Sequence, residues 1–154
     1  MSSDAARQNE MILALEAVIN ALHDSQTGFA DIGDHLKDET LKRYFLAESL
    51  KRASFRGDIE EFLHENGVRD ISEGGTTVGA VYRIWGDLKS KLGGGDNTLL
   101  VTAEKAGDEL EDAYTDALKR EIPLMLREML GTQREHILAS QDLIHDQREA
   151  AVMK

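Results

Sequence analysis

The chain has 154 residues, of which 41% are hydrophobic, 31% charged and 5% aromatic, with one proline and no cysteine. This composition favours an all-α domain over a β-sandwich or barrel, which needs more turn residues and β-branched runs. The formal net charge of −11 disfavours nucleic-acid binding, because an acidic chain repels phosphate backbones. Without cysteine, the chain has no disulfide, no thiolate nucleophile and no cysteine-type zinc site.

The length suits a single domain over residues 1–154, long enough to bury a core. The first residues, MSSDAARQNE, lack a basic region followed by an apolar one, so we expect no secretory signal. No apolar run is long enough to span a bilayer. We therefore expect a cytoplasmic protein that contacts neither membrane nor nucleic acid.

The first long helix is predicted over residues 4–36. Its apolar positions recur at steps of three and four, which places them on one face: Ile12, Leu15, Ile19, Leu22, Phe29 and Leu36. Gln26 takes the position on this face between Leu22 and Phe29. Gly28 and Gly33 lower the helix propensity, and we expect a bend or close packing there.

The second long helix is predicted over residues 38–66, with Asp38 as its N-cap. Its apolar face is formed by Leu41, Phe45, Phe55, Ile59 and Phe62. Glu48 and Arg52 fall in the middle of that face, four residues apart with the acid first, which suits an ion pair within the helix. Because a buried charge is costly unless it is paired, we expect these two side chains to neutralise each other.

The second helix also has an apolar strip on its opposite side, formed by Leu46, Leu50, Ala53 and Gly57. A helix that is apolar on two sides lies between neighbours or faces a partner chain. After it, a short helix is predicted over residues 77–92, between two glycine-rich segments. Its apolar side is formed by Val78, Val81, Trp85, Leu88 and Leu92.

The last two long helices are predicted over residues 97–122 and 123–149, with Pro123 in the first turn of the second. The core face of the former is rich in small residues and consists of Leu99, Ala103, Ala106, Leu110, Ala113, Tyr114 and Ala117. Small side chains allow another helix to approach closely. The final helix places Leu126, Leu130, Ile137 and Ile144 on its face, interrupted by Gln133 and Gln141.

Four long helices predict a bundle. Short turns join the first pair and the last pair, so each pair should be antiparallel. The middle connection, of about thirty residues, is long enough to return along the bundle and make the second and third long helices parallel. That connection is typical of the ferritin-like topology. A plain up-down bundle, with the short helix as an excursion, is the alternative.

Several short motifs resemble a bacterial family of about 150 residues, classed as a ferritin-like domain of unknown function. They are Asp24 and Gly28-Phe29 in the first helix, Glu48, Arg52 and Phe55 in the second, Trp85-Gly-Asp-Leu-Lys, Ala103-Glu104 with Gly107, Asp108 and Tyr114, and Gln133 near the end. Their order covers nearly the whole chain. The resemblance implies a ferritin-like four-helix bundle and implies no particular activity.

A di-iron centre in such a bundle needs inward glutamates and Glu-x-x-His pairs. Here Glu48 is followed three residues later by Lys51, and Glu135 by Leu138. The resemblance adds that similar chains often have histidine where Gln141 stands. The candidate metal ligands are therefore an incomplete set: Glu16, Glu48, Glu104 and Gln141. By periodicity only Glu48 is central to its face, and the nearest histidines, His23, His136 and His145, lie at the edges of theirs.

The simpler interpretation is a structural polar layer of Gln26, Glu48, Arg52 and Gln133, which sets helix register. We expect Gln141 to join its hydrogen bonds. No catalytic residue and no cofactor are predicted. The first hypothesis is a non-catalytic scaffold or interaction protein, a homodimer or higher homo-oligomer that associates through the second helix's extra strip or the Trp85 helix. The alternative is a ferritin-like metal protein that stores or oxidises iron at an atypical carboxylate site.

Overall fold

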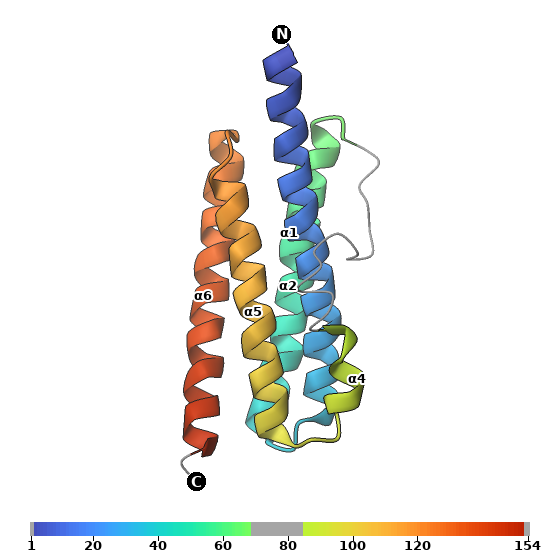
Figure 1. Cartoon of the computed structure of the whole chain (residues 1–154), viewed down its shortest axis with the longest axis vertical. Coiled ribbons are helices and arrows are strands. Elements are labelled where there is room, and N and C mark those ends of the chain that lie inside the picture. Colours follow the sequence, from blue (N-terminus) through green and yellow to red (C-terminus); the bar gives the residue numbers. More distant parts are fainter. Residues whose placement is uncertain (1, 69–84, 153–154) are drawn as a thin grey trace.

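The computed structural model describes residues 2–68 and 85–152, and within these ranges it is helical with no strand (Figure 1). The helices are α1 (Ser2–His35), α2 (Glu39–Glu65), α4 (Leu88–Lys91), α5 (Asp96–Leu118) and α6 (Leu124–Val152). The predicted all-α class is confirmed for this part of the chain. Of the short helix predicted over residues 77–92, residues 77–84 lie outside the described residues, and α4 begins only at Leu88.

The α-helix ends follow from local chemistry. Asp38 is the N-cap of α2, and its carboxylate accepts a hydrogen bond of 2.9 Å from the backbone N–H of Leu41. Gly67, with φ of 85°, turns the chain out of α2, because glycine adopts this left-handed conformation without steric cost. Most ends of the long helices lie within three residues of the predicted bounds.

The end of α5 differs from the prediction. The helix stops at Leu118, four residues before the expected Ile122. The guanidinium of Arg127 donates to the backbone carbonyls of Leu118 at 2.8 Å and Arg120 at 3.0 Å. These carbonyls would accept hydrogen bonds from backbone N–H groups if α5 continued. The residue before Pro123 also disfavours the helical conformation. A wider turn therefore joins α5 to α6.

The four long helices form an elongated bundle in which α1 and α2 are antiparallel, as are α5 and α6 (Figure 1). At one end, the backbone N–H groups of Lys37 and Asp38 donate to the carboxylate of Asp96 at 2.8 and 3.0 Å. At the other end, Arg7 forms an ion pair of 3.3 Å with Glu121. Helices α2 and α5 consequently run in the same direction, as the length of the middle connection predicts.

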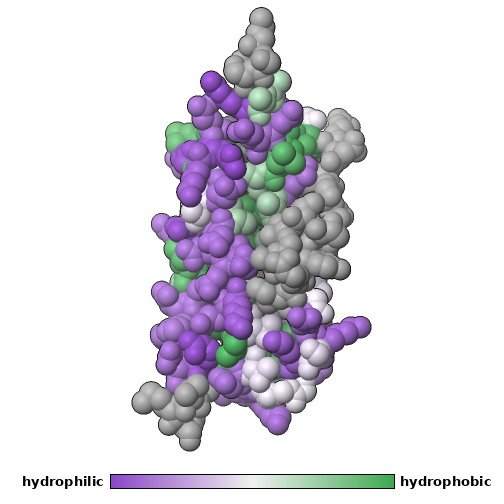
Figure 2. All heavy atoms as spheres, in the orientation of Figure 1, coloured by the Kyte–Doolittle hydropathy of each residue, from purple (hydrophilic) through white to green (hydrophobic). Residues whose placement is uncertain are grey.

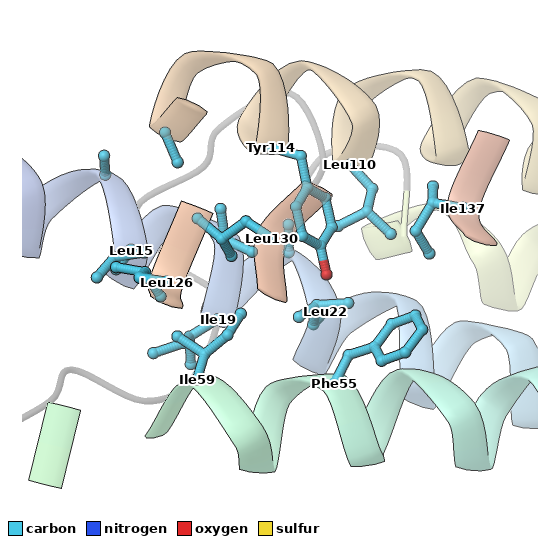
Figure 3. Packing of buried hydrophobic residues seen from close by; sticks show 14 of the residues in the cluster. Leu15, Ile19, Leu22, Phe55, Ile59, Leu110, Tyr114, Leu126, Leu130 and Ile137 are labelled. Carbon is cyan, nitrogen blue, oxygen red and sulfur yellow. The ribbon is translucent and has the colours of Figure 1, made fainter. Parts of the chain in front are cut away.

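Two apolar clusters fill the bundle. One contains Leu15, Ile19, Leu22, Phe55, Ile59, Leu110, Tyr114, Leu126, Leu130 and Ile137, which point toward one another from all four long helices (Figure 3). The other contains Phe29, Ile32, Leu36, Leu41, Phe45, Leu88, Leu99, Leu100, Ala103 and Ile144. Along α1, α2 and α6, the residues Ser25, Arg52 and Ser140 fall between members of the two clusters. A polar layer therefore separates two apolar halves of the core.

Glycines mark the places where helices approach closely. In α1, Gly33 lies against Leu46 of α2, and a methyl group there would be 2.9 Å from the leucine side chain. Gly28 lies against the ring of Trp85 in the same way. Leu46 is half-buried by this packing, whereas Leu50 is 72% exposed. The expected second apolar strip of α2 is therefore partly covered by α1, and Leu50 is its large side chain that faces solvent.

Candidate functional site

The guanidinium of Arg52 lies at the centre of the polar layer and has no exposed surface. Its Nε donates to Ser25 Oγ of α1 at 2.9 Å, and its Nη2 donates to Ser140 Oγ of α6 at 3.3 Å. Its Nη1 donates to Glu48 Oε1, one turn earlier in α2, at 2.7 Å. The ring of Phe29 lies 3.9 Å from the guanidinium carbon, in a cation–π contact. Three helices thus converge on one buried cation.

The carboxylate of Glu48 extends this group toward the surface. Glu48 as a whole is 7% exposed, and its Oε2 lies 2.9 Å from His136 Nε2 on α6. Burial acts to raise the pKa of Glu48, but the hydrogen bond and charge of Arg52, aided by His136, hold that pKa below its ordinary value. The His136 ring packs edge-on to Phe55 at 5.4 Å, and its side chain is 35% exposed. A chain of contacting polar side chains, Arg52, Glu48 and His136, therefore runs from the core to solvent between α2 and α6.

Two of the expected members of the polar layer lie elsewhere in the hydrogen-bond network. Gln133 is buried but accepts a hydrogen bond of 2.7 Å from the Tyr114 hydroxyl and donates to the Phe55 carbonyl at 3.3 Å. The side-chain oxygen of Gln26 is buried and has no hydrogen-bond partner within residues 2–68 and 85–152, and its backbone carbonyl accepts from Ser49 Oγ at 2.7 Å. Among the described residues, neither glutamine forms a hydrogen bond with Glu48 or Arg52.

The candidate metal ligands do not converge. Glu104 accepts from Arg148 Nε at 2.8 Å and lies 3.2 Å from His145 Nδ1. Gln141 donates to the backbone carbonyl of Glu104 at 2.9 Å and to Asp108 Oδ1 at 3.0 Å, rather than to the polar layer. Glu16 is half-buried on α1. Only Glu104 and Gln141 are brought together, through a main-chain contact.

This arrangement does not fit a di-iron centre. Within residues 2–68 and 85–152, no three histidine, aspartate or glutamate side chains gather in a way that could hold a metal ion. The carboxylates of Glu48 and Glu104 are each neutralised by a guanidinium. A divalent cation on Glu48 would lie beside the buried positive charge of Arg52, where repulsion is strong because water does not screen it. We therefore derive no metal chemistry from these residues.

A separate feature lies on the outer side of α1. Asp24 lines a small cavity of about 150 Å³ together with His23 and Trp85. Among the described residues, one of its carboxylate oxygens is buried and has no hydrogen-bond partner, and the same is true of Trp85 Nε1. Burial without a partner raises the pKa of Asp24 to about 6. An ionised Asp24 therefore destabilises the fold at neutral pH.

The helical periodicity of the sequence identified Glu48 and Arg52 as a charged pair on a core face, but it did not identify the side chains that contact them. The steps Leu22–Ser25–Phe29 and Ile137–Ser140–Ile144 are three and four residues, as regular as the steps through Gln26 and Gln141. The serines were therefore detectable as alternatives at the same level of the core. His136 precedes the core residue Ile137 and lies at the edge of its face, so only the position of α2 beside α6 shows its contact with Glu48.

A model of one protein family, described as a domain of unknown function (DUF2383), matches residues 10–120. The chain belongs to this family. The DUF2383 match contains Ser25, Glu48 and Arg52, whereas His136 and Ser140 on α6 lie beyond it. Neither a curated protein nor a solved structure matches the chain. Among the described residues, no helix combines the length and apolarity needed to cross a membrane.

Proposed function

We propose that this DUF2383 protein is a ferritin-like bundle that acts as a non-catalytic interaction protein, with a Glu48–Arg52 ion pair in place of a metal centre. Two features support the ferritin-like assignment. Helices α2 and α5 are parallel, so α2 ends and α5 begins at opposite ends of the bundle, as in ferritin-like proteins (Figure 1). The polar layer lies between two apolar halves of the core, on side chains that point inward from several helices.

The main support for a non-catalytic role is the fully buried guanidinium of Arg52. Its charge, its hydrogen bonds to two serines and its ion pair with Glu48 occupy the centre of the bundle. A carboxylate that is neutralised in this way is a poor ligand for a second cation. Buried ion pairs of this kind contribute more to helix register than to stability, which suits a rigid scaffold.

The support for an interaction role is the distribution of exposed apolar side chains. The large ones on the described surface are Leu13, Leu50, Leu124, Met125 and Leu143. The face seen in Figure 2 is mostly hydrophilic with a few separate hydrophobic areas, one of them beside the upper end of α6. Leu124 and Met125 are the first two residues of α6, and their exposed fractions are 69% and 76%. Adjacent exposed apolar side chains favour a contact with another molecule.

Self-association through the extra strip of α2 has weaker support than the sequence suggested. Leu46 packs against Gly33 of α1, which leaves Leu50 as the large exposed side chain of that strip. One exposed leucine is common on a monomer surface. Light scattering of wild type and Leu50→Ser tests for a dimer that forms through this strip. Such a dimer requires wild type to have the mass of two chains and Leu50→Ser the mass of one.

Metal analysis tests the non-catalytic proposal. We expect protein from iron-replete cells to contain nearly no iron, manganese or zinc. A stoichiometric metal that disappears in Glu48→Ala would contradict the proposal and favour the ferritin-like metal protein. The matched control is Glu61→Ala, an exposed carboxylate on the same helix, which should leave the metal content unchanged.

A further inference from the structure

A groove of about 390 Å³ lies between α2 and α6, along the first turns of α6. Its apolar lining consists of Phe55 from α2 and of Met125 and Met129 from α6. Phe55 is nearly buried, whereas Met125 is 76% exposed and Leu124 beside it is 69% exposed. Methionines four residues apart present a flexible apolar row along the helix, which adapts well to a partner's side chains.

The charged residues that line the groove are both acidic, and its neutral polar residues are Thr132 and Gln133. Asp58 of α2 and Glu128 of α6 line it from opposite sides, and both are exposed. Neither carboxylate forms an ion pair with another described residue, and no lysine or arginine is among the lining residues. The ammonium group of Lys51 lies 5.4 Å from the centre of the Phe55 ring. The groove is thus apolar at its floor and negative at its rim.

The apolar floor and the negative rim indicate what kind of partner fits the groove. A second copy of this chain, with a net charge of −11, would bring acidic surface against an acidic rim. A helix with one apolar face and flanking lysines or arginines matches both the floor and the rim. We propose, as an extension of the interaction role above, that the α2–α6 groove binds a basic amphipathic helix of a partner protein.

The test uses the full chain and three designed peptides of equal length. The first is a labelled leucine–lysine helix with apolar residues at steps of three and four, the second has glutamate in place of lysine, and the third has the first composition in scrambled order. We expect saturable binding of the leucine–lysine helix alone, measured by fluorescence anisotropy. Its affinity should fall as salt is raised, because salt screens exposed charges.

Substitutions inside and outside the groove test whether the peptide binds there. The double variant Asp58→Lys/Glu128→Lys should bind at least about tenfold more weakly, and Met125→Ser about fivefold more weakly. The matched control Asp112→Lys/Asp146→Lys makes the same charge change on exposed residues outside the groove and should lose far less affinity. All of these positions are exposed, so the variants should fold, which circular dichroism verifies.

Several results would overturn the inference. They are no binding of the leucine–lysine helix, equal binding of the glutamate or scrambled peptide, or equal weakening in the two double variants. A wild-type dimer that Met125→Ser converts to a monomer would show that a second copy fills the groove. The metal content of the same samples tests the proposed function separately. Protein that contains no metal and does not bind the peptide would refute peptide binding in the groove and leave the proposed ion pair in place of a metal centre unaffected.

Discussion

Replacing Glu48 with alanine would leave the guanidinium of Arg52 in the core without its carboxylate. Arg52 has no exposed surface, and the Glu48 side chain is 9% exposed, so water cannot readily replace the lost oxygen atoms. Removing one partner of a buried ion pair costs about 3–5 kcal/mol. The hydroxyls of Ser25 and Ser140 and the ring of Phe29 still contact the cation, so we expect a loss near the lower end, about 3 kcal/mol.

Urea denaturation followed by circular dichroism measures this loss. For a chain of this size, about 3 kcal/mol corresponds to a decrease of roughly 6–12 °C in Tm. Glu61→Ala removes an exposed carboxylate from the same helix and should change the free energy of unfolding by less than about 0.5 kcal/mol. Because the pKa of Glu48 is held below its ordinary value, its stabilising effect should disappear as the pH falls through that pKa.

The double variant Glu48→Leu/Arg52→Met separates an unpaired charge from lost packing. Replacing both partners with apolar side chains of similar size removes the buried cation, so the double variant should be more stable than Glu48→Ala. A loss below about 1 kcal/mol for Glu48→Ala would refute the reasoning, because Arg52 would then be hydrated. A double variant that is less stable than the single variant would equally contradict a cost due to unpaired charge.

Three further changes test other contacts. Asp24→Asn should stabilise the protein by about 1–2 kcal/mol at pH 7, since the raised pKa of about 6 makes stability fall as the pH rises through it. The gain should vanish near pH 4, and exposed Asp34→Asn should have no such effect in denaturation at both pH values. Tyr114→Phe leaves Gln133 Oε1 unpaired and should cost about 1–3 kcal/mol of unfolding free energy by urea denaturation; no loss would mean that another donor replaces the hydroxyl. Gly107→Ala places a methyl group against the Gln141 amide, which would have to leave its hydrogen bonds to Glu104 and Asp108. The variant should lower Tm in a thermal melt by an amount equivalent to about 1–3 kcal/mol, whereas an unchanged Tm would mean that the Gln141 side chain moves aside without cost.

Much of the core could be predicted from periodicity alone. The steps of three and four placed Leu15, Ile19 and Leu22 of α1 inside, and each is buried. They also identified Glu48 and Arg52 as charges on a core face, because i and i+4 positions share one side of a helix. Local patterns suffice here because each face is set by a single helix.

The remaining contacts depend on how the helices are placed against one another. Ser25 and Ser140 complete the hydrogen bonds of Arg52 because α1 and α6 approach α2 at that level. Gln133 instead meets Tyr114 of α5, which is a different neighbour from the one expected. Small polar side chains give a weak sequence signal, and the choice between adjacent positions on a helix face is decided by packing.

The metal content of protein purified from iron-replete cells distinguishes most directly between a Glu48–Arg52 ion pair and a metal centre in the bundle. We expect nearly no bound iron, manganese or zinc, because the guanidinium of Arg52 already neutralises Glu48 within the bundle. Elemental analysis of wild type and Glu48→Ala should therefore give the same low values. One or two metal ions per chain in wild type that are lost in Glu48→Ala would show instead that Glu48 is a metal ligand.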